Sequence, residues 1–259
     1  MVVKHQINDS SEISINYREW LGDWIDEQLI EELVESKYMS HLIHYIWQTY
    51  NSSDFVYPKN RKDIFHCFRS TPFHTTKVVI LGDEPSNHIM SNGIGPGLYH
   101  SDHTRTFSKQ IEDLEEAVTK NYESKFEWDK NLQTWKAKFD KKFDKSLTSW
   151  SNQGILFLNT SLINNHMDKE KEATKIIFRN LIRTVLKTIS DNLAGIIFVF
   201  TDEEQYKALN KYIDLTYHYI IKDFNGIDKD TNIFEEINQV LIDNDSDVEV
   251  LTEDVIINW

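Results

Sequence analysis

The sequence predicts an α/β fold with a central four-stranded parallel sheet flanked by helices. Four short apolar runs, rich in β-branched residues, are typical of buried parallel strands: Lys77–Leu81, Ile155–Leu158, Ile196–Phe200 and Tyr217–Ile221. Helical patterns separate these runs, and alternating strands and helices favour a parallel sheet covered on both faces. Only 8 glycines and 4 prolines occur in 259 residues, which indicates that most of the chain is regular structure.

Apolar periodicity places the expected helices. Two helices are expected between Trp20 and Tyr50, a short one within Phe55–Phe73, a highly charged one over Phe107–Phe143 and a closing one over Ile233–Ile242. The helix over Ala173–Ile189 is predicted to be amphipathic. Its apolar face carries Ile176, Ile177, Leu181, Ile182, Val185 and Ile189.

The bulk properties limit the class of protein. The length suits a single domain over residues 1–259, without repeats or linkers. No apolar run could span a bilayer, Met1–Ser14 lacks the apolar stretch of a signal peptide, and Cys67 is the only cysteine, so a cytoplasmic location is expected. No His/Cys cluster has metal-ligand spacing, so neither a metal nor a cofactor is expected. The Asn, Lys and Ile content suggests an AT-rich genome, such as that of a phage or mobile element.

The charge balance is unusual for a DNA-binding protein. There are 28 basic and 42 acidic residues, a formal net charge of −14. Affinity for nucleic acid comes largely from Lys and Arg, so binding to DNA would need a local basic patch. Two interpretations of the acidic residues remain open, namely solvated helix faces and a surface for a protein partner. The acidic C-terminal segment 243–259 is expected to be a solvated terminus, with an edge strand or a partner-binding tail as alternatives.

Polar side chains follow two of the predicted strands. Parallel sheets bind ligands beyond the carboxyl ends of their strands. After Leu81 the chain reads Gly-Asp-Glu-Pro-Ser-Asn-His, and two carboxylates with a histidine can hold and polarise a water. After Leu158 comes Asn159, whose amide suits the edge of a pyrimidine but could equally cap a loop.

Together these segments resemble the family 1 uracil-DNA glycosylases. The resemblance rests on Phe55–Pro58, Lys62–Phe65, Phe68–Pro72, Lys77–Gly82, Gly97–Ser101, and Trp150 with Gln153–Asn159. It extends from about Trp20 to Leu241 without a break. It implies that family's fold and its activity, which is base excision in DNA repair by a hydrolase that flips a base out of DNA, without a membrane or a cofactor.

The resemblance also implies site residues, several of which are altered. Glu84 aligns with the family's catalytic aspartate, and Asp83, in the place of a glutamine, is an alternative base. Pro85 is retained. Ser86 replaces the tyrosine that excludes thymine's methyl group, and His100 replaces the phenylalanine that stacks on uracil.

The loop after the last strand departs most from the family. Asn225 falls near the histidine that stabilises the leaving uracil anion, and His88 is a second candidate for that role. Phe224 or Ile227 could act as the wedge that enters the duplex. Ser101 and Arg105 are the remaining candidates for DNA contacts.

The retained and altered site residues are compatible with two functions. The first is a divergent DNA glycosylase that acts on uracil or a 5-substituted pyrimidine, with Asn159 reading the base. The second is a catalytically inactive glycosylase fold that serves as a binding or scaffold factor, such as in viral or phage DNA replication. The retained acid and amide favour the first, and the four altered positions favour the second.

Overall fold

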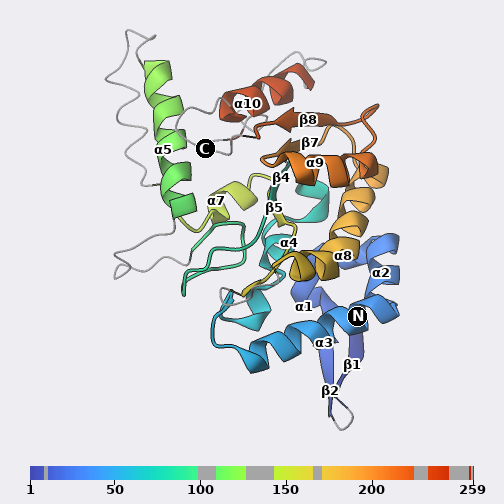
Figure 1. Cartoon of the computed structure of the whole chain (residues 1–259). Helices are drawn as coiled ribbons and strands as arrows, with labels where there is room; N and C mark the ends of the chain where they lie inside the picture. The colour runs from blue at the N-terminus through green and yellow to red at the C-terminus, as the bar shows by residue number, and fades with distance from the viewer. Residues whose placement is uncertain are drawn as a thin grey trace.

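The computed structural model in Figure 1 describes residues 1–8, 11–98, 109–126, 143–165, 171–224 and 233–244, together with Ile257 and Trp259. Its main sheet has four parallel strands in the order β5-β4-β7-β8. These strands are β4 (Val78–Gly82), β5 (Ile155–Asn159), β7 (Ile197–Phe200) and β8 (Tyr219–Lys222). The predicted four-stranded parallel sheet is confirmed, although β8 begins two residues later than the run that predicted it.

The two faces of the sheet carry separate hydrophobic clusters. Successive side chains of a strand point to opposite faces, so Val79 and Leu81 of β4 enter one cluster while Val78 and Ile80 enter the other. Helices cover both faces (Figure 1). The first cluster is covered by α1 (Tyr17–Leu21), α2 (Gln28–Glu35), α3 (Lys37–Ser52), α4 (His66–Ser70), α8 (Lys171–Asn192) and α9 (Glu203–Leu209). The second is covered by α5 (Lys109–Phe126), α7 (Thr148–Ser151) and α10 (Ile233–Asn244).

Two small antiparallel pairs complete the strands. β1 (Val2–Asn8) and β2 (Ser11–Asn16) form an N-terminal hairpin that packs on α3 and that the sequence analysis did not predict. β3 (Val56–Tyr57) pairs with β6 (Asn164–Asn165), which follows β5. Short 3-10 turns occur at η1 (Gly22–Asp26), η2 (Arg61–Asp63), η3 (Phe73–Thr75) and η4 (Asn210–Tyr212).

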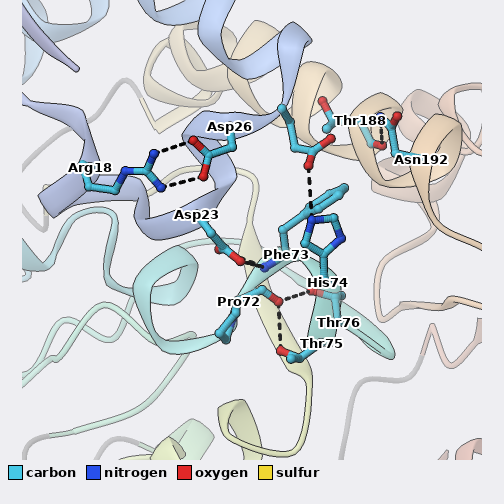
Figure 2. A network of polar contacts seen from close by, with 11 residues as sticks. Arg18, Asp23, Asp26, Pro72, Phe73, His74, Thr75, Thr76, Thr188 and Asn192 are labelled. Carbon is cyan, nitrogen blue, oxygen red and sulfur yellow. Dashed lines mark hydrogen bonds and ion pairs between the residues drawn. The ribbon is translucent and has the colours of Figure 1, made fainter.

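A polar network fixes the chain just before β4 (Figure 2). Both carboxylate oxygens of Asp23, in η1, accept from the Phe73 amide at 3.0 and 3.2 Å. The hydroxyls of Thr75 and Thr76 donate to the Pro72 carbonyl at 3.0 and 3.2 Å. The bonds from Asp23 join η1 to the turn that leads into β4. The start of β4 is therefore held in place by η1, which lies between α1 and α2 in the chain.

Two expectations from the sequence need correction. Ile176 is 55% exposed, so it lies outside the apolar face of α8 to which its spacing assigned it. The end of the chain is not simply solvated, because Ile257 is buried and exchanges two hydrogen bonds with the Asn238 side chain, at 2.9 and 3.1 Å. Trp259 packs on Phe234 and Trp150 at ring-centroid distances of 4.7 and 5.0 Å. The two last-described residues therefore belong to the second cluster.

The charged helix is shorter in the described residues than its pattern predicted. α5 covers Lys109–Phe126, and residues 127–142 lie outside the described part. No helix in the described ranges combines the length and apolar character needed to cross a membrane.

Candidate functional site

The carboxyl ends of the four strands bring four loops to one edge of the sheet. These loops follow Gly82 on β4, Asn159 on β5, Phe200 on β7 and Lys222 on β8. Because β4 lies between β5 and β7, the loop after β4 has neighbours on both sides. This is the edge where open parallel sheets bind ligands.

Gly82 and Asn159 lie opposite each other at this edge. They are partners in the β4–β5 register, and a Cβ on Gly82 would lie 2.2 Å from Asn159 Oδ1. The Asn159 side chain therefore occupies the space that the glycine leaves. Asn159 is 5% exposed, and its amide forms no hydrogen bond within the described ranges. The predicted loop cap is thus not seen there, and the amide keeps its donors and its acceptor for a ligand.

Asp83 is directed to α8 by an ion pair. Its Oδ1 lies 2.7 Å from Lys175 Nζ, and 47% of the side chain is exposed. Thr160 Oγ1 adds hydrogen bonds to the Asp83 carbonyl and carboxylate, at 3.0 and 3.3 Å. Two partners thus hold the Asp83 carboxylate on the α8 side of the edge.

The next residues of the loop are progressively enclosed. Glu84 is half-buried, and Pro85 and Ser86 are buried. The Pro85 carbonyl accepts from Asn164 Nδ2 at 3.0 Å, which joins the loop to the segment after β5. Ser86, which replaces the family's tyrosine, is only 1% exposed.

The His88 ring accepts a hydrogen bond from the backbone. The Met90 amide donates to its Nδ1 at 3.1 Å, so the acceptor role of Nδ1 places the proton of the neutral ring on Nε2. The His88 amide in turn donates to Ser86 Oγ at 3.3 Å. His88 is half-buried, and its ring therefore offers an N–H donor.

Gln205 is a site residue that the sequence analysis did not single out. It lies on α9, and its Nε2 donates to the Gly82 carbonyl at 3.3 Å. Its Oε1 is buried and has no hydrogen-bond partner in the part of the chain that the structure describes. Thr201 Oγ1 donates to the adjacent Leu81 carbonyl at 3.1 Å. The only signal in the sequence was the position of Thr201 and Gln205 in the segment that follows β7.

The other predicted site residues are not seen beside the loop after β4 in the described part of the chain. His100, Ser101, Arg105, Asn225 and Ile227 lie outside the described residues.

Phe224 follows β8, two strands away from β4, and is 41% exposed. Its ring lies 5.9 Å from that of Tyr206. The described cluster therefore consists of Asp83, Glu84, Pro85, Ser86, His88 and Asn159.

The sheet order, the helical layers and the loops at this edge define the chain as an α/β protein with the uracil-DNA glycosylase fold. A crystal structure of mimivirus uracil-DNA glycosylase matches 89% of this chain and 87% of its own, with a TM-score of 0.65 at 16% identity. A structure of the UNG protein of Nitratifractor salsuginis matches 80% of this chain and 85% of its own, with a TM-score of 0.52 at 12% identity.

Sequence comparison leads to the same family. The chain is 28% identical over 201 residues to the uracil-DNA glycosylase of Fusobacterium nucleatum, which covers 78% of this chain and 79% of that relative. It is 27% identical over 207 residues to that of Aliivibrio salmonicida, covering 76% and 79%. No protein-family model matches it. The chain is related to the uracil-DNA glycosylases.

Proposed function

We propose that the chain is a DNA glycosylase that hydrolyses the N-glycosidic bond of a pyrimidine flipped out of DNA. The observation that carries this proposal is the pairing of Gly82 with Asn159 in neighbouring strands. It places the Asn159 amide, which has no hydrogen-bond partner in the described ranges, at the sheet edge where Glu84 follows two residues after Gly82. An amide that reads a base and an acid that positions water are the two groups this reaction needs most. The names of the relatives support the same reaction class.

Glu84 is the residue we assign to the water. In the reaction the bond between C1′ and the base nitrogen breaks, and its electron pair leaves with the base. The water oxygen bonds to C1′, and Glu84 accepts the water proton. Asp83 is the weaker candidate because Lys175 and Thr160 hold its carboxylate on the α8 side.

The other roles follow the positions of the remaining residues. Asn159 reads the base edge, and Pro85 and Ser86 form the adjoining wall. His88 offers an N–H to the leaving base anion, and Asn225 is its alternative. We further propose that His100 stacks on the base, and that Ser101, Arg105, Phe224 and Ile227 contact DNA. Ser86 is smaller than the family's tyrosine, so both uracil and 5-substituted pyrimidines are proposed substrates.

A substrate panel tests the reaction. The protein is produced in a host without uracil-DNA glycosylase activity, because a trace of the host enzyme would imitate the result. Single-stranded and duplex oligonucleotides carrying uracil, thymine, hydroxymethyluracil or modified cytosines are incubated with it, and abasic sites are cleaved with alkali. Asn159→Ala protein, purified in parallel, is the matched control.

The outcomes separate the two functions. Release of uracil or a 5-substituted base by the wild-type chain, reduced at least about 10²-fold in Asn159→Ala, supports the proposal. Binding of the same oligonucleotides without release of any base would instead support the inactive, DNA-binding alternative. Neither binding nor release, at high protein and low salt, would contradict both.

A further inference from the structure

The segment Tyr57–Arg69 concentrates positive charge in an acidic chain. It contains Lys59, Arg61, Lys62 and Arg69, and Asp63 is its single acid. Asp63 is buried and lies 3.7 Å from Arg69, so this pair is compensated within the fold. Three cations therefore remain, in a chain whose formal net charge is −14.

These three cations lack acidic partners in the described part of the chain. Arg61 Nη2 donates to the neutral Asn51 Oδ1 at 2.7 Å, and Lys59 Nζ donates to a backbone carbonyl, that of Asp54. Lys62 is exposed and forms no ion pair there. By contrast, Lys4, Arg18 and Lys187, elsewhere on the surface, each lie against a carboxylate. We call Lys59, Arg61 and Lys62 the cationic patch.

Aromatic rings support two members of the patch. The Arg61 guanidinium lies over Trp47 and Tyr50, at 4.8 and 5.3 Å from the ring centroids. Lys59 Nζ lies over the Tyr57 ring at 4.4 Å. Contacts of this kind hold a cation in place without neutralising it. The patch is thus partly ordered before any ligand arrives.

The cationic patch borders the loop that follows β4. The His66 ring donates from Nδ1 to the Asn92 carbonyl at 2.7 Å. Gly93 passes so close to Asp63 that a Cβ on Gly93 would lie 1.8 Å from the Asp63 carbonyl oxygen.

A second connection lies at the other end of the loop. Tyr57 pairs with Asn164, whose side chain reaches the Pro85 carbonyl. In Figure 1 the blue-to-cyan segment after α3 accordingly runs beside the green loop after β4. The segment that carries the cationic patch is therefore joined to both ends of the loop after β4, which holds most of the candidate site residues.

We propose that the DNA strand next to the flipped nucleotide runs across the cationic patch, with its phosphates on Lys59, Arg61 and Lys62. This inference rests on the proposed function, whose substrate is DNA. A polyanion is the partner that three unpaired cations fit, because neutralising phosphates releases counterions and supplies most of the affinity of such complexes. The patch also supplies the local basic surface that an acidic chain needs to bind DNA.

A matched pair of triple variants tests the patch. The first is Lys59→Gln, Arg61→Gln, Lys62→Gln. The second removes the same three charges elsewhere and is Lys4→Gln, Arg18→Gln, Lys187→Gln. Binding to a fluorescent single-stranded oligonucleotide is measured by anisotropy from low to moderate salt, and thermal unfolding checks that both variants fold. Because Arg61 packs on two rings, the double variant Lys59→Gln, Lys62→Gln is measured as well.

The salt dependence distinguishes the outcomes. Each phosphate contact on a single strand contributes about 0.7 to the slope of log affinity against log salt, so the patch triple should lower the slope by about 2 and the double by about 1.4. The control triple should keep the wild-type slope. Equal slopes in both triples, with DNA still bound and base still released, would overturn the patch and leave the proposed function standing. No binding by the wild-type chain would overturn both.

Discussion

Gly82 and Asn159 face each other across β4 and β5, and the side chain of one fills the space left by the other. A methyl group at position 82 would meet the Asn159 amide at 2.2 Å, so the amide would have to turn away. The position of the candidate base-reading group thus depends on a glycine in the neighbouring strand.

Gly82→Ala is therefore expected to reduce base release at least about 10²-fold while lowering the free energy of unfolding by less than about 2 kcal/mol. The reason is that the atom displaced is the end of a side chain rather than backbone. The measurement is a double-mutant cycle with Asn159→Ala. Gly82→Ala should cost little further activity when Asn159 is already alanine. Fully additive losses would show that the two residues act independently.

Asp83 and Glu84 are adjacent in the sequence, but their side chains have different surroundings in the structure. Because Lys175 and Thr160 already hold the Asp83 carboxylate, Asp83→Asn is expected to keep base release within about threefold of wild type, an effect of well under 1 kcal/mol on the barrier. Lys175→Met should behave in the same way. Initial rates of base release are the measurement. A loss in Asp83→Asn as large as that in Glu84→Gln would move the water-positioning role to Asp83.

Because the His66 ring is largely buried, we expect the free energy of unfolding to depend on pH. Burial lowers the pKa of its imidazole below the ordinary value of 6.5, because the charged ring loses solvation; nearby Arg69 lowers it further, and the Asn92 carbonyl opposes the shift. The unfolded chain then binds a proton more readily than the folded chain as the pH falls below about 6.5. The free energy of unfolding should be highest above 6.5 and decrease as the pH falls towards the lowered pKa.

Urea unfolding between pH 7.5 and 5 measures this dependence. His66→Gln should flatten the decrease in part, since burial also lowers the pKa of His5 and its contribution has the same sign. His5→Gln with His66→Gln should flatten it further. An unchanged profile in both variants would contradict a role for these two rings.

Because Ile257 is buried in the second cluster, we expect the end of the chain to stabilise the fold. It is 1% exposed, so Ile257→Ala should lower the free energy of unfolding by about 2–5 kcal/mol. Ile176→Ala is the matched control, because Ile176 is 55% exposed and should change stability by less than about 0.5 kcal/mol. Denaturant unfolding measures both variants. Equal effects would mean that Ile257 is not held in the second cluster.

The sheet was predictable from the sequence because its strands are buried on both faces. A strand such as Val78–Gly82 has no polar face, so its apolar run is unbroken and easily recognised. The N-terminal hairpin was missed for the opposite reason, since Ile15 is the only residue of β2 that is buried and the other five positions are partly or fully exposed. Ile257 was missed because the acidic residues before it dominate the composition of the C-terminal segment.

The site was predictable only in part, because its geometry depends on contacts between distant residues. The positions of Glu84 and Asn159 followed from strand ends. The contact of Asn164 with Pro85 spans 79 residues, and that of Gln205 with Gly82 spans 123. No local pattern encodes such pairs. The ion pair that separates Asp83 from Glu84 likewise comes from α8 and is invisible in the motif itself.

The most direct test of base excision at this site is single-turnover release of uracil from a single-stranded oligonucleotide, comparing wild type, Glu84→Asp and Glu84→Gln. We expect release by the wild-type chain, a loss of at least about 10²-fold in Glu84→Gln, and measurable activity in Glu84→Asp, which keeps the carboxylate. Equal rates in wild type and Glu84→Gln would contradict the assignment of Glu84. No release of uracil by the wild-type chain, with no release of the 5-substituted bases either, would contradict the proposed activity itself.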